Sequence, residues 1–244
     1  MKPILVLAII YVLLMLSPCQ AGFLDDFSKI LQPQAKQQIS LDESTIVKGL
    51  KEALATGTER AITAVSKTDG YFGNQLIKIL LPAKVRQVAD VIGALGYQQQ
   101  VDEVVLTMNR AAEKAAPKAA VFFGDAIRQM TVEDAKGILN GGDTAATNFF
   151  DRKTRSQLFA AFKPTVATNM DKTGATRAYK EMIGKYNVSP LATLAGVPSL
   201  DLDTYVTNNA LDGLFKMLAE EEKKIRTNPA ARTTDVLQKV FGSK

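Results

Sequence analysis

Three polar residues on one predicted helix are spaced so that their side chains could meet at a ligand. Asn109 and Glu113 are four residues apart, and Arg110 precedes Glu113 by three. Residues at these spacings share one face of a helix, so an amide, a guanidinium and a carboxylate would lie together beside the apolar face. They could bind a polar ligand in a groove. The spacing alone favours the alternative, an ion pair on the helix surface, which contributes less than about 0.5 kcal/mol.

A glycine-rich turn is the second candidate site. It has the sequence Asn140-Gly141-Gly142-Asp143-Thr144 and stands between two predicted helices. The free backbone N–H groups at the start of a helix can bind an anion. We predict that the Asp143 side chain caps the following helix and so occupies some of these donors. A helix that stops and restarts explains the turn more simply than an anion site does.

The residue types that are missing limit the chemistry further. The chain has no histidine, and Cys19 is its only cysteine. Ser-His-Asp and Cys-His catalysis are therefore excluded, and so is a zinc site of the usual kind. The glycine-rich dinucleotide and phosphate-loop motifs are absent as well. The sequence predicts no catalytic residue, no metal and no cofactor, and any catalysis would use carboxylates, lysine, arginine, tyrosine or a backbone anion site.

The first 21 residues have the pattern of a secretory signal peptide. Lys2 precedes an uncharged apolar run from Ile4 to Leu16, and small residues at Cys19 and Ala21 offer a cleavage site before Gly22. The run is shorter than the about 20 residues that a membrane-spanning helix needs. We therefore expect a periplasmic protein whose mature chain has no cysteine. The alternative is a lipoprotein anchored at Cys19, but Pro18 fits that signal poorly.

The composition adds little about partners. The formal net charge is +5, and the densest basic cluster is Arg152-Lys153-Thr154-Arg155. No aromatic side chains alternate with these basic residues to stack on bases, so we predict no nucleic-acid partner. No long apolar stretch follows residue 21, and the mature chain is expected to have no transmembrane segment.

Residues 22–40 are predicted to form a short amphipathic helix followed by a glutamine-rich linker. The apolar residues fall on one helical face and could make a peripheral contact with a membrane or a partner. The polar face carries two aspartates and one lysine, which does not suit an anionic membrane, so we favour a helix that folds back onto its own domain. The apolar residues are Phe23, Leu24, Phe27, Ile30 and Leu31.

Residues 41–242 are predicted to form a single all-α globular domain of about ten helices. Apolar residues recur with a helical period, and no alternating strand pattern of four or more residues is found. Caps and breakers set the expected boundaries. The first five expected helices run from Ser40 to about 65, from Pro82 to 95 before Gly96, over 98–116, from there to about 130, and over 131–140. A sixth begins at Asp143, a seventh begins at Thr154 and bends at Pro164, and an eighth ends near 186. The ninth runs from Asp201 to a solvated charged end at 220–224, and the last begins at Asn228.

Several segments resemble a known bacterial family. In this order they are similar to the exported family called domain of unknown function 4197, over nearly all of the chain after the signal peptide. The resemblance implies an envelope protein with a helical domain, and it implies no activity, substrate or catalytic residue. The segments are IVKGLKEAL at 46–54, MNRAAEKAAP at 108–117, DAKGILNG at 134–141, LFAAFKP at 158–164, GLF at 213–215, AEEEKKI at 219–225 and PAAR at 229–232.

Two classes of function remain open at this point. The first is a non-enzymatic periplasmic protein that binds an envelope partner or a small ligand in a groove between helices. The second is a carboxylate-based hydrolase or lyase that acts on an envelope component, for which two carboxylates facing each other across a deep cleft would be the sign. Lipid handling is a further alternative, which an enclosed apolar cavity opening near residues 22–31 would favour.

Overall fold

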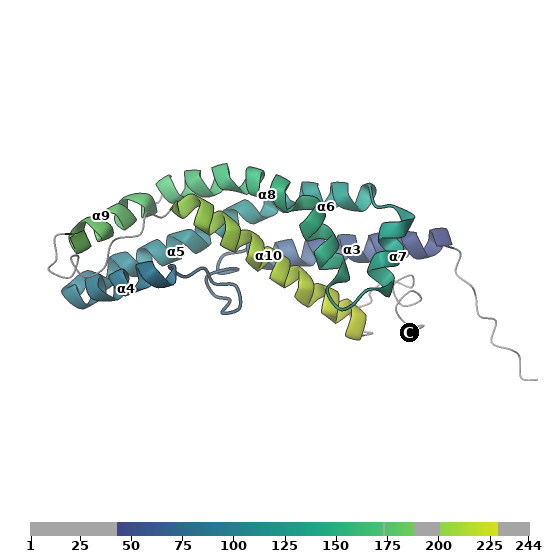
Figure 1. Ribbon diagram of the computed structural model, residues 1–244, viewed down its shortest axis with the longest axis horizontal. Coiled ribbons are helices and arrows are strands. Elements are labelled where there is room, and N and C mark those ends of the chain that lie inside the picture. The colour runs from purple at the N-terminus through teal and green to yellow at the C-terminus, as the bar shows by residue number, and fades with distance from the viewer. Residues whose placement is uncertain (1–42, 173, 188–200, 229–244) are drawn as a thin grey trace, which may run out of the picture. The chain divides into compact units, whose positions relative to one another are not determined.

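The helices of the computed structural model begin and end close to where the sequence places them. The structure describes residues 43–172, 174–187 and 201–228, which are helical apart from turns and loops and contain no strand, so the all-α prediction is confirmed (Figure 1). The elements are α3 (Glu43–Ser66), α4 (Ala83–Ile92), the π-helical η1 (Gly93–Tyr97), α5 (Gln98–Ala115), the 3-10 turn η2 (Ala116–Lys118), α6 (Ala119–Arg128), α7 (Val132–Asn140), α8 (Ala145–Lys172), α9 (Ala175–Asn187) and α10 (Leu202–Thr227).

Local capping explains several of the boundaries. Thr131 and Asp134 form a reciprocal capping box at the start of α7. Asp201 caps α10 by accepting a hydrogen bond from the backbone N–H of Thr204. The turn before α5 contains Gly96 at φ 94°, a left-handed conformation that glycine adopts without strain. These boundaries match the ones predicted from the same residues.

The α8 helix is longer than predicted. We expected a new helix at Thr154, but α8 continues through both Thr154 and Pro164. The Thr154 side chain is buried, and its hydroxyl donates to the carbonyl of Phe150 at 2.7 Å instead of capping a helix. The described residues therefore form eight α-helices. The predicted helices at 22–31 and after Asn228, and the predicted cap at Ser40, lie outside these residues.

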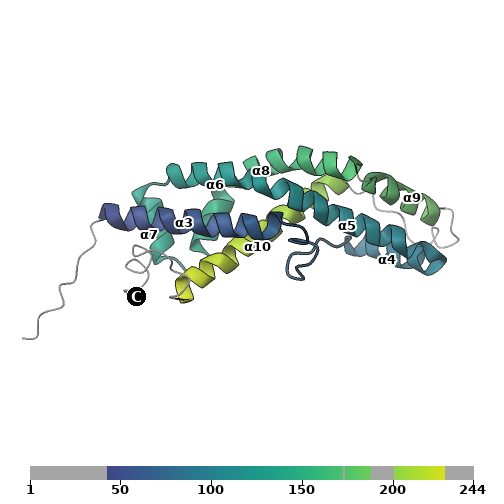
Figure 2. The same ribbon diagram turned by 180° about the vertical axis from the view of Figure 1, so that it is seen from behind.

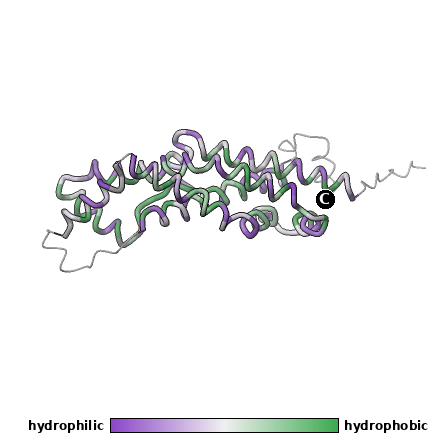
Figure 3. The backbone as a smooth tube through the Cα atoms, turned by 90° about the horizontal axis from the view of Figure 1, so that it is seen from above, coloured by the Kyte–Doolittle hydropathy of each residue, from purple (hydrophilic) through white to green (hydrophobic). Residues whose placement is uncertain are grey.

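Helices α5, α8 and α10 pack against one another. Helix α10 also packs against α3, and α5 also packs against α9. Figures 1 and 2 show α10 crossing α3. Hydrophobic and hydrophilic stretches follow one another along the helices (Figure 3). The buried apolar residues of the helices form one hydrophobic core. Large side chains at the centre of this core are Phe123, Phe150, Phe162, Met108 and Leu211.

The connection between α3 and α4, residues 67–82, is packed into the fold although it is not helical. Tyr71 is fully buried, and its hydroxyl donates to the carbonyl of Ala210 on α10 at 2.6 Å. Gly213 makes room for it, since a Cβ atom there would lie 2.7 Å from Cε1 of Tyr71. After the turn that ends at Ile77, residues 78–82 are neither helix nor turn, and Ile77, Ile79 and Leu81 are buried. This segment matters for the predicted site, because α5 anchors it.

Some large apolar residues among the described helices and turns face solvent. Leu95 is exposed in the turn between α4 and α5, and Val121 is exposed on α6. No helix in the described ranges has both the length and the apolar character needed to cross a bilayer.

Candidate functional site

The side chain of Asn109 binds the backbone of Ile79 in the later part of the 67–82 segment. It is fully buried. Its Oδ1 accepts from the N–H of Ile79, and its Nδ2 donates to the carbonyl of Ile79, each at 2.8 Å. Nδ2 also donates to the carbonyl of Val105 in the preceding turn of α5. The amide of Asn109 therefore pairs with both backbone groups of Ile79. A role of Asn109 in ligand binding stays a prediction.

Glu113 holds the other end of the same segment. Its side chain is only 3% exposed. Oε1 accepts from the backbone N–H groups of Tyr71 at 3.1 Å and Phe72 at 3.3 Å, and Oε2 pairs with Nη1 of Arg110 at 2.8 Å. The interpretation of this pair as a surface ion pair was wrong for Glu113, because the 67–82 segment covers the carboxylate.

Arg110 connects this buried carboxylate to the surface. Its second nitrogen, Nη2, lies 2.7 Å from Oδ1 of Asp69, which is exposed. The hydrogen bond to Glu113 is the main cause that raises the pKa of Arg110. Burial raises the pKa of the Tyr71 hydroxyl, and the negative charge of Glu113 raises it further. The three predicted residues of α5 thus form a network that fixes a loop.

The anion at the start of α8 is a side chain of the protein itself. Oε1 of Glu222, on α10, accepts from the N–H of Ala146 at 2.9 Å, and Oε2 accepts from the N–H and the hydroxyl of Thr147, also at 2.9 Å. The predicted cap, Asp143, is exposed in the turn, and α8 begins two residues later. A carboxylate does accept from these N–H groups, but it belongs to Glu222 on α10 and not to Asp143.

Sequence reasoning missed Glu222 because it lies in a charged run. Residues 220–224 were predicted to be a solvated face, yet Glu221 and Glu222 are buried. Arg226 balances the charge of Glu222 through Nε at 3.0 Å and Nη2 at 2.8 Å. The position of Glu222 in the sequence could have indicated its burial. It is four residues after Leu218 and three before Ile225, so it lies on the apolar face of α10.

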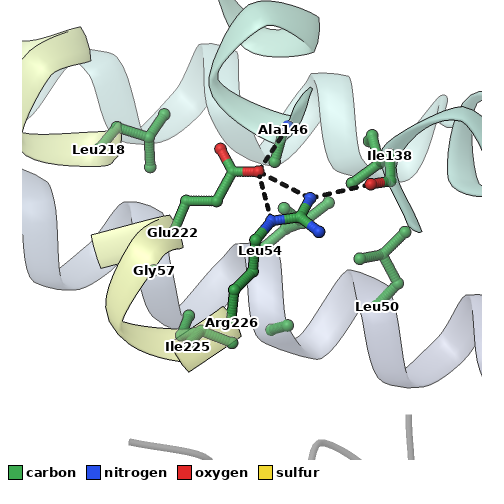
Figure 4. A pocket seen from close by; sticks show the side chains of 10 residues that line it. Leu50, Leu54, Gly57, Ile138, Ala146, Leu218, Glu222, Ile225 and Arg226 are labelled. Carbon is green, nitrogen blue, oxygen red and sulfur yellow. Dashed lines mark hydrogen bonds and ion pairs between the residues drawn. The ribbon is translucent and has the colours of Figure 1, made fainter. Parts of the chain in front are cut away.

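The cavity beside Glu222 is apolar and small. Figure 4 shows Glu222 and Arg226 at its edge, with dashed lines to Ala146 and Ile138. Leu50, Leu54 and Leu218 are among its lining residues. Its volume is about 30 Å³, enough for a water-sized group. This cavity does not have the space that an acyl chain would need. Residues 22–31, near which the lipid-handling alternative expects an apolar cavity, lie outside the described residues.

A larger hollow lies between α6, α7 and the first turns of α8. It consists of two adjoining cavities of about 220 and 580 Å³, which share Asp134 and Phe149 in their linings. We call this hollow the α7–α8 groove. Gln129, Thr131, Asn148 and other polar residues line it, and the total size is typical of small-molecule sites.

Another hollow of comparable size offers a poorer site. It has a volume of about 710 Å³ and follows the N-terminal half of α3. Apart from Val132, its described lining comes from that one helix, so it has little opposing wall to enclose a ligand. The α7–α8 groove, in contrast, has walls on three helices.

Comparison with known proteins places the chain in a family. A family model described as a protein of unknown function, DUF4197, matches residues 40–242. The chain belongs to the DUF4197 family. The resemblance seen in the sequence is thereby confirmed. No curated protein and no solved structure matches the chain.

The four predicted ligand residues of this DUF4197 protein do not form a single site. Asn109, Arg110 and Glu113 join α5 to the 67–82 segment, whereas Asp143 stands in the turn whose neighbours, Gly142 and Thr144, line the α7–α8 groove. In the part of the chain that the structure describes, no group of three or more His, Cys, Asp or Glu side chains is arranged to hold a metal ion.

Proposed function

We propose that this DUF4197 protein is exported and binds a small ligand in the α7–α8 groove without catalysing a reaction on it. The observation that carries the proposal is the polar groove that residues of three helices line. Concave sites with a few polar groups are where proteins bind small molecules. The proposal thus moves the expected binding site from α5 to the start of α8.

The described buried carboxylates support binding over catalysis. Glu113 and Glu222 each accept two backbone N–H groups and pair with an arginine. Glu221 pairs with Lys224 at 2.6 Å. A general acid or base needs access to the substrate, and these three groups are engaged within the fold instead. Together with the lack of histidine, this leaves few groups for acid–base catalysis.

One observation favours the enzymatic alternative. Asp125 and Asp134 both line the smaller cavity of the groove, where two carboxylates could act on one substrate. Both carboxylates already have partners nearby in the sequence. Asp125 pairs with Arg128, and Asp134 accepts from the N–H of Thr131 at 3.2 Å. If the pair is catalytic, Asp134→Asn will abolish turnover of a bound envelope polymer while leaving its binding intact.

Export is supported by the sequence of the first 21 residues, from Lys2 through the apolar run to the cleavage pattern at Ala21. A chain of this size can bury a core large enough to be stable in the periplasm without disulfides. Cleavage after Ala21 removes the only cysteine. The lipoprotein alternative, anchored at Cys19, would place the same domain at a membrane surface.

The groove can be blocked without disturbing its walls. A Cβ atom built on Gly137 meets nothing within 4 Å, and this residue of α7 lines the larger cavity. Gly137→Phe should therefore fill the groove while improving the helix propensity of α7. Gly184→Phe on α9, where a Cβ atom also meets nothing within 4 Å, is the matched control.

The test is a binding screen of the purified, processed protein against peptides, sugars and phosphorylated metabolites by protein NMR. We expect compounds that shift the amide signals of Gly137, Gly142 and Asn148 in the wild type and in Gly184→Phe, and no such shifts in Gly137→Phe. Compounds that bind Gly137→Phe as well as the wild type would contradict the proposal, and so would a screen without any groove ligand.

A further inference from the structure

The two walls of the larger cavity carry opposite charges that do not pair with each other. Glu133 and Asp134 lie in the first turn of α7, and Arg152 faces them from α8. Among the described residues no ion pair joins α7 to α8, so these carboxylate oxygens lie more than 4.0 Å from the guanidinium nitrogens. Opposite charges held apart across a groove leave room for a ligand that bridges them.

The geometry of α8 explains why its cations line the groove. Arg152 and Lys153 are three and four residues after Phe149, and residues at these spacings lie on one face of a helix. Phe149 lines both cavities, while Arg152 lines the larger and Lys153 the smaller. Lys153 Nζ lies 5.9 Å from the centre of the Phe149 ring. Neither cation has an ion-pair partner within residues 43–172, 174–187 and 201–228.

The acidic wall is also incompletely neutralised. Lys136 on α7 forms its salt bridge with Glu43 of α3, and Glu133 attracts it only through its charge. Asp134 accepts from the backbone N–H of Thr131, which carries no charge. Asp125 adds no net charge, because Arg128 pairs with it. The groove is thus negative on the α7 side and positive on the α8 side.

We propose that the ligand of the groove is a zwitterion of short-peptide chemistry. Its ammonium group faces Glu133 and Asp134, and its carboxylate faces Arg152 and Lys153. A ligand with one charge would leave one wall without a partner, whereas a zwitterion satisfies both walls. This inference rests on the proposed function and adds the chemical class of the ligand to it.

The test compares four peptides of nearly the same size by calorimetric titration of the processed protein. Trialanine carries both terminal charges, its N-acetyl form keeps only the carboxylate, its amide keeps only the ammonium, and the doubly blocked form has neither. We expect trialanine to bind about tenfold more tightly than either singly blocked form, since a charge-assisted hydrogen bond of about 1.4 kcal/mol corresponds to a factor of ten.

Variants of the two walls sharpen the same test. Arg152→Glu should weaken trialanine binding about tenfold and leave the affinity for its amide unchanged or higher. Glu133→Lys should weaken it similarly and leave the affinity for the N-acetyl form unchanged or higher. Both residues are exposed, so these variants should fold. Lys216→Glu, an exposed charge reversal on α10 outside the groove, is the control and should change nothing.

The outcomes separate this inference from the proposed function. If a blocked peptide binds in the groove as tightly as trialanine, the groove is a binding site but its ligand is not a zwitterion, and only the inference fails. If peptides do not bind but another class of compound shifts the groove signals, the result is the same. If nothing binds in the groove, both proposals fail.

Discussion

Glu113 and Glu222 solve the same physical problem at two places in the fold. Each is a buried carboxylate that accepts hydrogen bonds from two successive backbone N–H groups of another segment. Each is balanced by an arginine on its own helix, Arg110 or Arg226. A buried charge is tolerated only when it is paired and hydrogen-bonded, and both sites meet that condition. These side chains therefore tie segments of the fold together.

We predict that Glu113→Gln destabilises the fold. Glutamine can still accept from the backbone, but it removes the charge that Arg110 pairs with, so the free energy of unfolding should fall by about 1–3 kcal/mol. Urea unfolding measures this change. Arg110→Gln should cost less than Arg110→Glu, because Arg110 is 32% exposed and a neutral amide leaves no new charge beside Glu113. Unchanged stability in Glu113→Gln would show that the carboxylate is not structural.

At the scale of single residues, the sequence predicts which side chains share a face but not which are buried. The spacing of Asn109 and Glu113 correctly places them together. Their burial depends on residues 67–82, which lie about 30 to 40 positions earlier and contact α5 only in the folded chain. Glu222 was missed for the same reason, because its partners are on α8.

Among the elements, the contact between α10 and the 67–82 segment requires a glycine. A Cβ atom at Gly213 would lie 2.7 Å from the Tyr71 ring and 3.2 Å from Cβ of Ile77. We expect Gly213→Ala to lower the free energy of unfolding by about 1–3 kcal/mol through overpacking. Gly184→Ala on α9, where the new methyl meets nothing, should instead raise it by up to about 1 kcal/mol. Equal melting temperatures for the two variants would refute this account.

The cap of α10 should make the stability of this helix depend on acid pH. Hydrogen bonds from the hydroxyl and the backbone N–H of Thr204 lower the pKa of Asp201 from 3.8 to about 2. A carboxyl group with a lowered folded-state pKa stabilises the fold above its unfolded pKa, and this contribution is lost as pH falls toward the folded value. The difference in melting temperature between wild type and Asp201→Ala should therefore shrink from pH 5 to pH 2. A difference that stays constant over this range would contradict the assignment.

Most elements could be predicted because their signals are local. Apolar periodicity and the caps at Thr131 and Asp201 need only a few neighbouring residues. The helix start predicted at Thr154 was wrong for a physical reason. A threonine hydroxyl can accept from a backbone N–H at the start of a helix or donate to the carbonyl four residues earlier, as it does here, and the sequence does not distinguish the two. The α8 helix is therefore one element where two were expected.

For the whole molecule, the α7–α8 groove has no signature in the sequence. Its lining comes from the end of α6, from α7 and from the first turns of α8, and it forms only when these three elements pack. In the sequence, Arg152 and Lys153 stand out only as part of the densest basic cluster. Their position opposite the acidic turn of α7 is a property of the packing.

The proposed export predicts a defined N-terminus. Cleavage after Ala21 should give a periplasmic protein that begins at Gly22 and has no cysteine, because the apolar run and the small residues before Gly22 direct the signal peptidase. Intact mass spectrometry of the periplasmic fraction checks this. A diacylated form starting at Cys19 in the membrane fraction would contradict it and establish a lipoprotein.

The central claim is that the α7–α8 groove binds the ligand and that the α5 carboxylate holds the fold together. Melting temperature and binding of the groove ligand, measured side by side for Gly137→Phe and Glu113→Gln, test it most directly. We predict that Gly137→Phe keeps the melting temperature of the wild type and loses binding, whereas Glu113→Gln melts at a lower temperature and retains binding below it. Loss of binding in Glu113→Gln at unchanged stability, with binding retained in Gly137→Phe, would contradict the account and place the site on α5.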